Sequence, residues 1–205
     1  MEIAIGLGGP VWVFGLSAGA TLAGWAAATR PAVSRLVLAA PLVAPMGFPM
    51  PVVRMMVRKP WMVPKRYWWW DPRKKADLGH SPYAYPGFPI PGLMAFLQLS
   101  EALIDQAVVP TQQLERVVLT DNPGDFAVRR DVARTFASGV FGRHAEYYGE
   151  ANVDPQLKWM HDFVDPWSPG AGTTEQVVAI LSSALGVGEP TAGGILVAPF
   201  VAEQA

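Results

Sequence analysis

The sequence contains no cysteine, which excludes a disulfide framework, a thiolate metal site and a cysteine nucleophile. Charge is also scarce, because Asp, Glu, Lys and Arg make up 16% of the 205 residues while 51% are apolar. A disordered chain shows the opposite balance, so we expect a packed core. The net charge of −1 gives no sign of a nucleic-acid partner. The lack of cysteine also fits a cytoplasmic protein.

Charged side chains are missing altogether from Ile3 to Thr29, a stretch long enough to span a membrane. The stretch could also be a signal peptide, with the small residues 26–28 as its cleavage site. However, it contains six glycines and Pro10, and Glu2 precedes it where a signal peptide would carry Lys or Arg. This composition favours a strand and a turn over one continuous helix, so no integral membrane span is expected.

Three consecutive segments predict a strand–helix–strand unit. Residues 11–14 form an apolar, β-branched and aromatic run that is typical of a strand buried on both faces of a parallel sheet. Residues 18–29 are small and compatible with a helix, and residues 35–40 predict a second buried strand. The spacing fits a βαβ crossover, and the fold class is therefore expected to be α/β.

The later elements extend this unit into a parallel sheet of about four strands flanked by helices. Strands are expected over 116–120 and 146–148, and helices over 92–107, 127–138 and 173–185. Residues 41–92 interrupt the pattern, because eleven of the 20 prolines fall there. We therefore expect a core over 1–40 and 93–186, an insertion over 41–92, and a poorly ordered tail over 187–205.

Residues 15–19 read Gly-Leu-Ser-Ala-Gly, which fits the G-x-S-x-G pattern of a nucleophile elbow. In such an elbow Ser17 occupies a strained turn between a strand and a helix. Side chains in place of Gly15 or Gly19 would collide with these elements. The same residues also fit a helix contact between two small residues, or an ordinary glycine-rich turn. The predicted strand before Ser17 and the helix after it favour the elbow.

A serine hydroxyl needs a base to take its proton, and the chain has three histidines. His161 lies in a loop after the fourth predicted strand, where the chain order Ser, acid, His places the base. His80 falls in the insertion, and His144 stands beside Arg143 at the start of a strand. We therefore predict His161 as the base, with a surface-loop histidine as the alternative.

The acid that orients this histidine should follow a strand, and two aspartates do so. Asp121 is nearer the strand end, while Asp125 lies past a Pro-Gly turn from which the chain can fold back toward the histidine. We favour Asp125. Either residue could instead form a turn or cap a helix.

Four segments together resemble the α/β-hydrolase superfamily, in particular its esterase- and lipase-like members: residues 11–25, 35–41, 117–128 and 159–166. The resemblance implies a serine hydrolase that cleaves carboxylic esters through an acyl-enzyme, without a metal or cofactor. It implies Ser17 as nucleophile, Asp125 as acid, His161 as base and the Ala18 amide as a donor of the oxyanion hole. The insertion takes the place of the family's cap or lid.

In that family the elbow follows the fifth of eight strands, whereas here it follows the first predicted strand. The chain thus resembles the C-terminal part of such a hydrolase, without the loop that supplies a second oxyanion donor. We expect the elbow strand to be an exposed apolar edge that favours self-association. The alternative function is a catalytically inactive remnant that binds a partner or lipid.

The insertion is rich in aromatic and basic residues. Its aromatic side chains are expected to line an apolar pocket above Ser17, or else to form the insertion's own small core. Eight basic residues and one acid fall between Arg54 and Lys75. This run could attract anionic lipid or a carboxylated substrate, although a solvated lid face is the commoner role of such runs. The predicted substrate-binding residues are Trp68, Trp69, Trp70, Tyr83 and Tyr85.

Overall fold

The computed structural model describes residues 1–69, 85, 87–105, 110, 113–168, 170–187 and 195–199. Two predicted substrate-binding residues, Trp70 and Tyr83, lie outside the described residues, as does His80.

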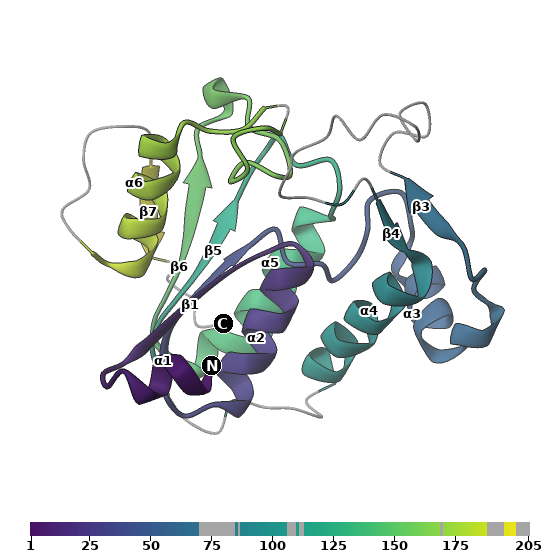
Figure 1. Ribbon diagram of the computed structural model, residues 1–205, viewed down its shortest axis with the longest axis horizontal. Coiled ribbons are helices and arrows are strands. Elements are labelled where there is room, and N and C mark those ends of the chain that lie inside the picture. Colours follow the sequence, from purple (N-terminus) through teal and green to yellow (C-terminus); the bar gives the residue numbers. More distant parts are fainter. Residues whose placement is uncertain are drawn as a thin grey trace, which may run out of the picture.

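One five-stranded sheet forms the centre of the molecule, in the order β1-β2-β5-β6-β7 (Figure 1). The first four strands are parallel, as the sequence predicted. The fifth pairs antiparallel with β6 and comes from the expected tail, residues 187–205. The strands are β1 (Val11–Leu16), β2 (Val33–Ala39), β5 (Leu114–Asp121), β6 (Ala145–Val153) and β7 (Ile195–Pro199).

Helices cover both faces of this sheet. Successive residues of a strand point to opposite sides, so each strand contributes side chains to the packing on both faces. Leu36 and Leu38 of β2 pack on one face in a cluster with side chains of α2 and α5, while Val37 packs on the other face with Ala184 of α6. None of the helices in the described ranges is long and apolar enough to cross a bilayer. The helices are α1 (Glu2–Gly6), α2 (Ala18–Thr29), α4 (Ile90–Ile104), α5 (Arg130–Phe141) and α6 (Thr174–Leu185).

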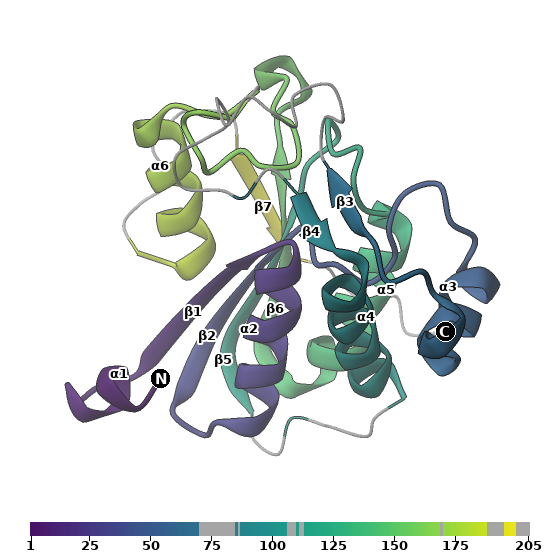
Figure 2. The same cartoon turned by 45° about the vertical axis from the view of Figure 1, so that its right-hand side comes forward.

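The insertion forms a separate group of short elements beside the sheet (Figures 1 and 2). It contains α3 (Met50–Arg58), the 3-10 turn η1 (Pro60–Met62), and a small antiparallel sheet of β3 (Tyr67–Trp69) and β4 (Gly87–Pro89). Helix α4 starts inside the expected insertion and continues past residue 93. It packs against α3 on one side and α2 on the other, and so joins the insertion to the core.

The carboxyl ends of the four parallel strands lie at the same end of the sheet, here called its carboxyl edge. Leu16 at the end of β1 pairs with Ala39 at the end of β2, and Ala39 pairs with Thr120 near the end of β5. This register brings together the turn after β1, the loop after β5 and the loop after β6. These are the three segments that carry the predicted nucleophile, acid and base.

Candidate active site

Ser17 lies in a strained turn between β1 and α2. Its backbone has φ 56° and ψ −122°, a conformation that residues with a side chain seldom adopt. The turn is held by β2 and the chain after it. The Ser17 amide donates to the Ala39 carbonyl at 2.9 Å, and the Leu42 amide donates to the Ser17 carbonyl at 3.1 Å. The Ser17 hydroxyl makes no capping hydrogen bond to the helix that follows.

The two glycines of the motif have different roles. A Cβ atom at Gly15 would overlap the Gly19 carbonyl oxygen and lie 2.6 Å from the Cα atom of Ala20, so only glycine fits there. A Cβ atom at Gly19 would meet nothing within 4 Å, so the expected collision at that position is wrong. Gly15 belongs to β1 and Gly19 to α2, which rules out the alternative of a contact along one helix.

Asp125 and His161 are joined directly. The His161 Nδ1 atom lies 2.9 Å from the Asp125 Oδ2 atom, and their side chains are 14% and 2% exposed. The other carboxylate oxygen accepts hydrogen bonds from the amides of Ala127 and Val128, at 2.8 and 3.2 Å. Asp125 is therefore fixed by its own loop and leaves one oxygen for the imidazole.

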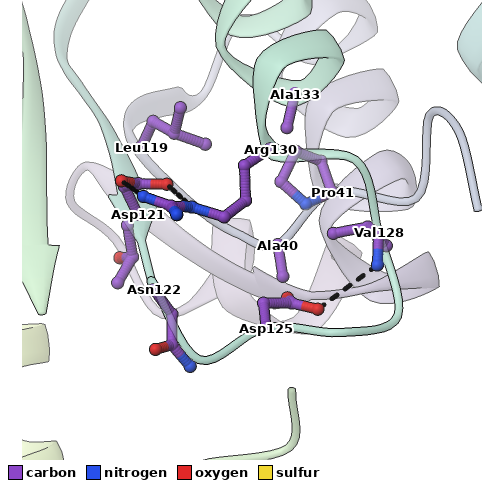
Figure 3. A pocket seen from close by; sticks show the side chains of 10 residues that line it. Ala40, Pro41, Leu119, Asp121, Asn122, Asp125, Val128, Arg130 and Ala133 are labelled. Carbon is purple, nitrogen blue, oxygen red and sulfur yellow. Dashed lines mark hydrogen bonds and ion pairs between the residues drawn. The ribbon is translucent and has the colours of Figure 1, made fainter. Parts of the chain in front are cut away.

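Asp121, the other candidate acid, has different partners (Figure 3). Its carboxylate, 4% exposed, accepts hydrogen bonds at 2.7 Å from Arg130 and from Arg134. The Asp121 carboxylate in turn raises the pKa of the Arg130 guanidinium. A small pocket lies between these groups and the acid loop, residues 122–129, which carries Asp125. Neither Ser17 nor His161 lines this pocket. Asp121 thus pairs with cations of α5 and not with a histidine.

Two residues without a predicted role, Asn122 and Gly124, connect the acid loop to the histidine loop, residues 154–173, which carries His161. Asn122, which is buried, donates from Nδ2 to the carbonyls of Trp159 and Met160 at 3.2 and 2.8 Å, and accepts from the Gly124 amide at 3.0 Å. A Cβ atom at Gly124 would overlap the Trp159 carbonyl oxygen. The Asn-Pro-Gly turn was the available signal, but nothing in it showed which loop it would meet.

The turn that carries Ser17 and the loop that carries His161 are connected by packing of their neighbouring residues. Leu16, just before Ser17, packs in one apolar cluster with Trp159 and Phe163, which stand two residues on either side of His161. Within the described ranges, no hydrogen bond joins the Ser17 hydroxyl to His161. Such bonds are often long when no substrate is bound.

Ala18 lies at the carboxyl ends of the parallel strands, whereas His144 lies at their amino ends. Ala18 is the first residue of α2, so its amide has no partner earlier in the helix. It packs with Leu16 against a largely aliphatic cluster that includes Val53, Val57 and Met94. His144 lies in a 3-10 turn before β6, at the amino end of that strand.

The described aromatic residues of the insertion are not among the side chains that pack against the elbow. Trp68 is 55% exposed and Tyr85 is 84% exposed. Trp69 meets the edge of the Tyr67 ring, with 4.8 Å between ring centroids. The buried residues of the insertion in the cluster next to the elbow are aliphatic. The roles of Trp68, Trp69 and Tyr85 in binding a substrate stay a prediction.

Comparison with known proteins identifies the fold. No family model and no curated protein matches the sequence. The chain is similar to a soluble variant of monoglyceride lipase from Saccharomyces cerevisiae, at 12% identity and a TM-score of 0.58, over 89% of this chain and 63% of that one. It is also similar to a monoacylglycerol lipase from Paleococcus ferrophilus, at 18% identity and a TM-score of 0.57, over 90% of this chain and 72% of that one.

A third similar structure comes from work on two metagenome-derived lipolytic enzymes, LipS and LipT, at 15% identity and a TM-score of 0.56. These neighbours are α/β-hydrolases, and the chain therefore has the α/β-hydrolase fold that the sequence resemblance implied. It spans 63% of the length of the yeast protein and of the metagenome-derived enzyme, which fits a partial version of that fold.

Proposed function

We propose that this chain is a serine hydrolase of carboxylic esters that works through an acyl-enzyme. Ser17 is the nucleophile, His161 is the general base, and Asp125 holds the imidazole in the required tautomer. The observation that carries the proposal is the hydrogen bond between His161 and Asp125 at the sheet edge where the strained turn presents Ser17. The similarity to lipolytic enzymes supports the same chemistry.

In the first half of the reaction, the Ser17 oxygen attacks the ester carbonyl carbon while His161 Nε2 takes the hydroxyl proton. His161 then gives that proton to the departing alkoxide, and the alcohol leaves. In the second half, water attacks the acyl-serine with His161 again as base, which releases the carboxylic acid and restores Ser17. Asp125 bonds to Nδ1 and so leaves Nε2 free to act toward Ser17.

The negative charge that develops on the carbonyl oxygen needs hydrogen-bond donors fixed in advance. The Ala18 amide supplies one of them, because it directly follows the nucleophile at the start of α2. The helix adds the positive end of its dipole at the same point. Gly15 contributes indirectly, since it allows the close approach of the strand to the start of this helix.

An apolar acyl group is the substrate portion that best fits the surroundings of Ser17. The side chains packed around Leu16 and Ala18 are mainly aliphatic. Met46 and Phe48 are 47% and 41% exposed, and the Met46 amide donates at 2.8 Å to the Ala127 carbonyl in the acid loop. These side chains offer an apolar surface close to the site, and binding of the acyl chain there would remove that surface from water.

The test is covalent labelling by a fluorophosphonate. The unaltered protein should be labelled and Ser17→Ala should not, while the matched variant Ser168→Ala should be labelled as fast as the unaltered protein. Hydrolysis of p-nitrophenyl esters should then be faster for a longer acyl chain than for acetate. Labelling that persists in Ser17→Ala, or is lost in Ser168→Ala, would refute the assignment of the nucleophile.

A further inference from the structure

We propose that one surface of the insertion docks onto an anionic lipid bilayer. This cap surface consists of exposed residues of α3, η1, β3 and the segments between them: Arg54, Met55, Arg58, Lys59, Trp61, Met62, Lys65, Arg66, Tyr67 and Trp68. The proposal does not depend on the hydrolytic activity, because none of these side chains belongs to the apolar cluster around Leu16 and Ala18.

Helix α3 separates its side chains into two faces. Val53 and Val57, four residues apart, are buried against α4 and the elbow. Met55 and Arg58 lie on the opposite face, Arg54 lies at its border with α4, and all three are exposed. The helix therefore anchors the insertion with one face and presents a mixed apolar and basic face to the outside.

Several large apolar side chains in α3 and in the segments that follow it are also exposed. Trp61 is 74% exposed and Met62 is 63% exposed in η1, directly after α3. Trp68 in β3 and Met55 in α3 are 55% and 49% exposed. A solvated lid face would need only the charges, whereas a concentration of exposed apolar side chains marks a binding surface. Tryptophan in particular favours the boundary between water and lipid.

Charge identifies the partner. Every charged residue from 41 to 69 is basic, namely Arg54, Arg58, Lys59, Lys65 and Arg66, although the whole chain has a net charge of −1. Arg54 has an acidic partner, Glu101 of α4 at 3.4 Å, yet its side chain stays 51% exposed. Clustered cations attract the negatively charged headgroups of a bilayer, and the neighbouring tryptophans can enter its interface.

Helix α3, which carries part of the cap surface, lies on the side of the molecule away from α6 in both views (Figures 1 and 2). Because α3 packs over the elbow with its buried face, docking would hold the elbow next to the lipid surface. If the proposed function is correct, this arrangement would bring Ser17 close to esters that partition into a bilayer.

The test is co-sedimentation of the full chain with vesicles of phosphatidylcholine, with and without phosphatidylserine. We expect binding that requires phosphatidylserine and weakens with added salt. The double variant Lys59→Glu/Lys65→Glu and, separately, the double variant Trp61→Gln/Met62→Gln should each lower the binding constant by about tenfold or more. Matched variants on other surfaces, Trp167→Gln and Arg143→Glu, should bind as the unaltered protein does.

Three results would overturn the proposal: no binding to either vesicle, equal binding to both, or loss of binding in the matched variants as well. A sizing column distinguishes a protein partner from lipid. If Trp61→Gln/Met62→Gln abolishes self-association while the unaltered protein ignores vesicles, the surface binds a second copy of the chain and not a membrane. Fluorophosphonate labelling of the same variants keeps this outcome separate from failure of the proposed hydrolase, because labelling does not require lipid.

Discussion

The two sides of the candidate site are held in different ways. On the side of β5 and β6, Asp125 bonds to His161, and Asn122 connects their loops through buried hydrogen bonds. On the side of β1, Ser17 follows an edge strand that has a single neighbour, β2, within the described part of the sheet. Asp125 and His161 are therefore positioned by several contacts at once, whereas Ser17 relies on one tight turn and one neighbouring strand.

The largest expected effect comes from exchanging the two neighbouring aspartates. Asp125→Asn should lower the rate of labelling and turnover on the order of 10⁴-fold, because an amide at this position favours the wrong imidazole tautomer. Asp121→Asn should leave the chemistry within a few-fold but destabilise the fold by about 3 kcal/mol, because it leaves Arg130 and Arg134 without their buried partner. Labelling kinetics and urea unfolding of both variants separate these losses.

Equal rate losses in the two variants would contradict the distinction between a positioning acid and a structural one. A large stability loss in Asp125→Asn with a normal rate would reverse their roles.

A smaller effect is expected where the acid loop touches the histidine loop. Gly124→Ala would place a methyl group against the Trp159 carbonyl, so the loops must separate and His161 must shift relative to Asp125. We expect a loss of about 1–3 kcal/mol in the free energy of unfolding and slower labelling of Ser17. Gly139→Ala is the matched control, because a Cβ atom there meets nothing within 4 Å in α5 and alanine favours helix.

If Gly124→Ala labels at the normal rate despite lost stability, the joint between these two loops does not position the histidine.

The difference between the turn at Ser17 and the loops of Asp125 and His161 also explains how far the sequence could predict the site. Ser17 and His161 follow from chain order and from a motif that needs a strand on one side and a helix on the other. The choice between Asp121 and Asp125 depends on where the side chains point, since both follow the same strand. Arg130 and Arg134, four residues apart on α5, were the available hint that Asp121 has cationic partners.

The least predictable parts were those whose structure depends on distant partners. Strand β7 gains its hydrogen bonds from β6, more than forty residues earlier in the chain, so its Ala- and Gly-rich surroundings gave no local sign of pairing. In the insertion, the many prolines remove any regular period, so the direction of an individual side chain such as Trp68 could not be deduced. Helix α2 was easier, because small residues throughout suit a helix packed on two sides.

The edge position of β1 predicts self-association, with a moderate effect. Trp12 is 42% exposed on this strand, which carries no charged side chain of its own. We expect concentration-dependent dimers or larger species, which Trp12→Glu should shift toward monomer because a charge on an edge strand opposes pairing. Leu22→Glu, at a 49% exposed position on α2, is the matched control. Light scattering on a sizing column measures both, and an unaltered protein that stays monomeric at every concentration would show that this edge does not pair.

The smallest effect concerns an exposed ion pair at the other end of the same strands. Arg35 of β2 lies 4.5 Å from the centroid of the Trp12 ring and bonds to Glu115 of β5, so it links the edge strand to the middle of the sheet. The hydrogen bond from Arg35 lowers the pKa of the Glu115 carboxyl below its usual value. A carboxyl whose pKa is lower in the folded state stabilises the fold above its unfolded pKa, about 4.3, and loses that contribution as the pH falls through the folded value. Glu115→Gln should therefore lower the Tm slightly at pH 7 and leave it unchanged near pH 3, while Glu146→Gln, at an exposed position on β6, should show no such pH-dependent difference. A Tm difference for Glu115→Gln that is the same at both pH values would mean that packing of the side chain, and not its charge, secures β1 at this end.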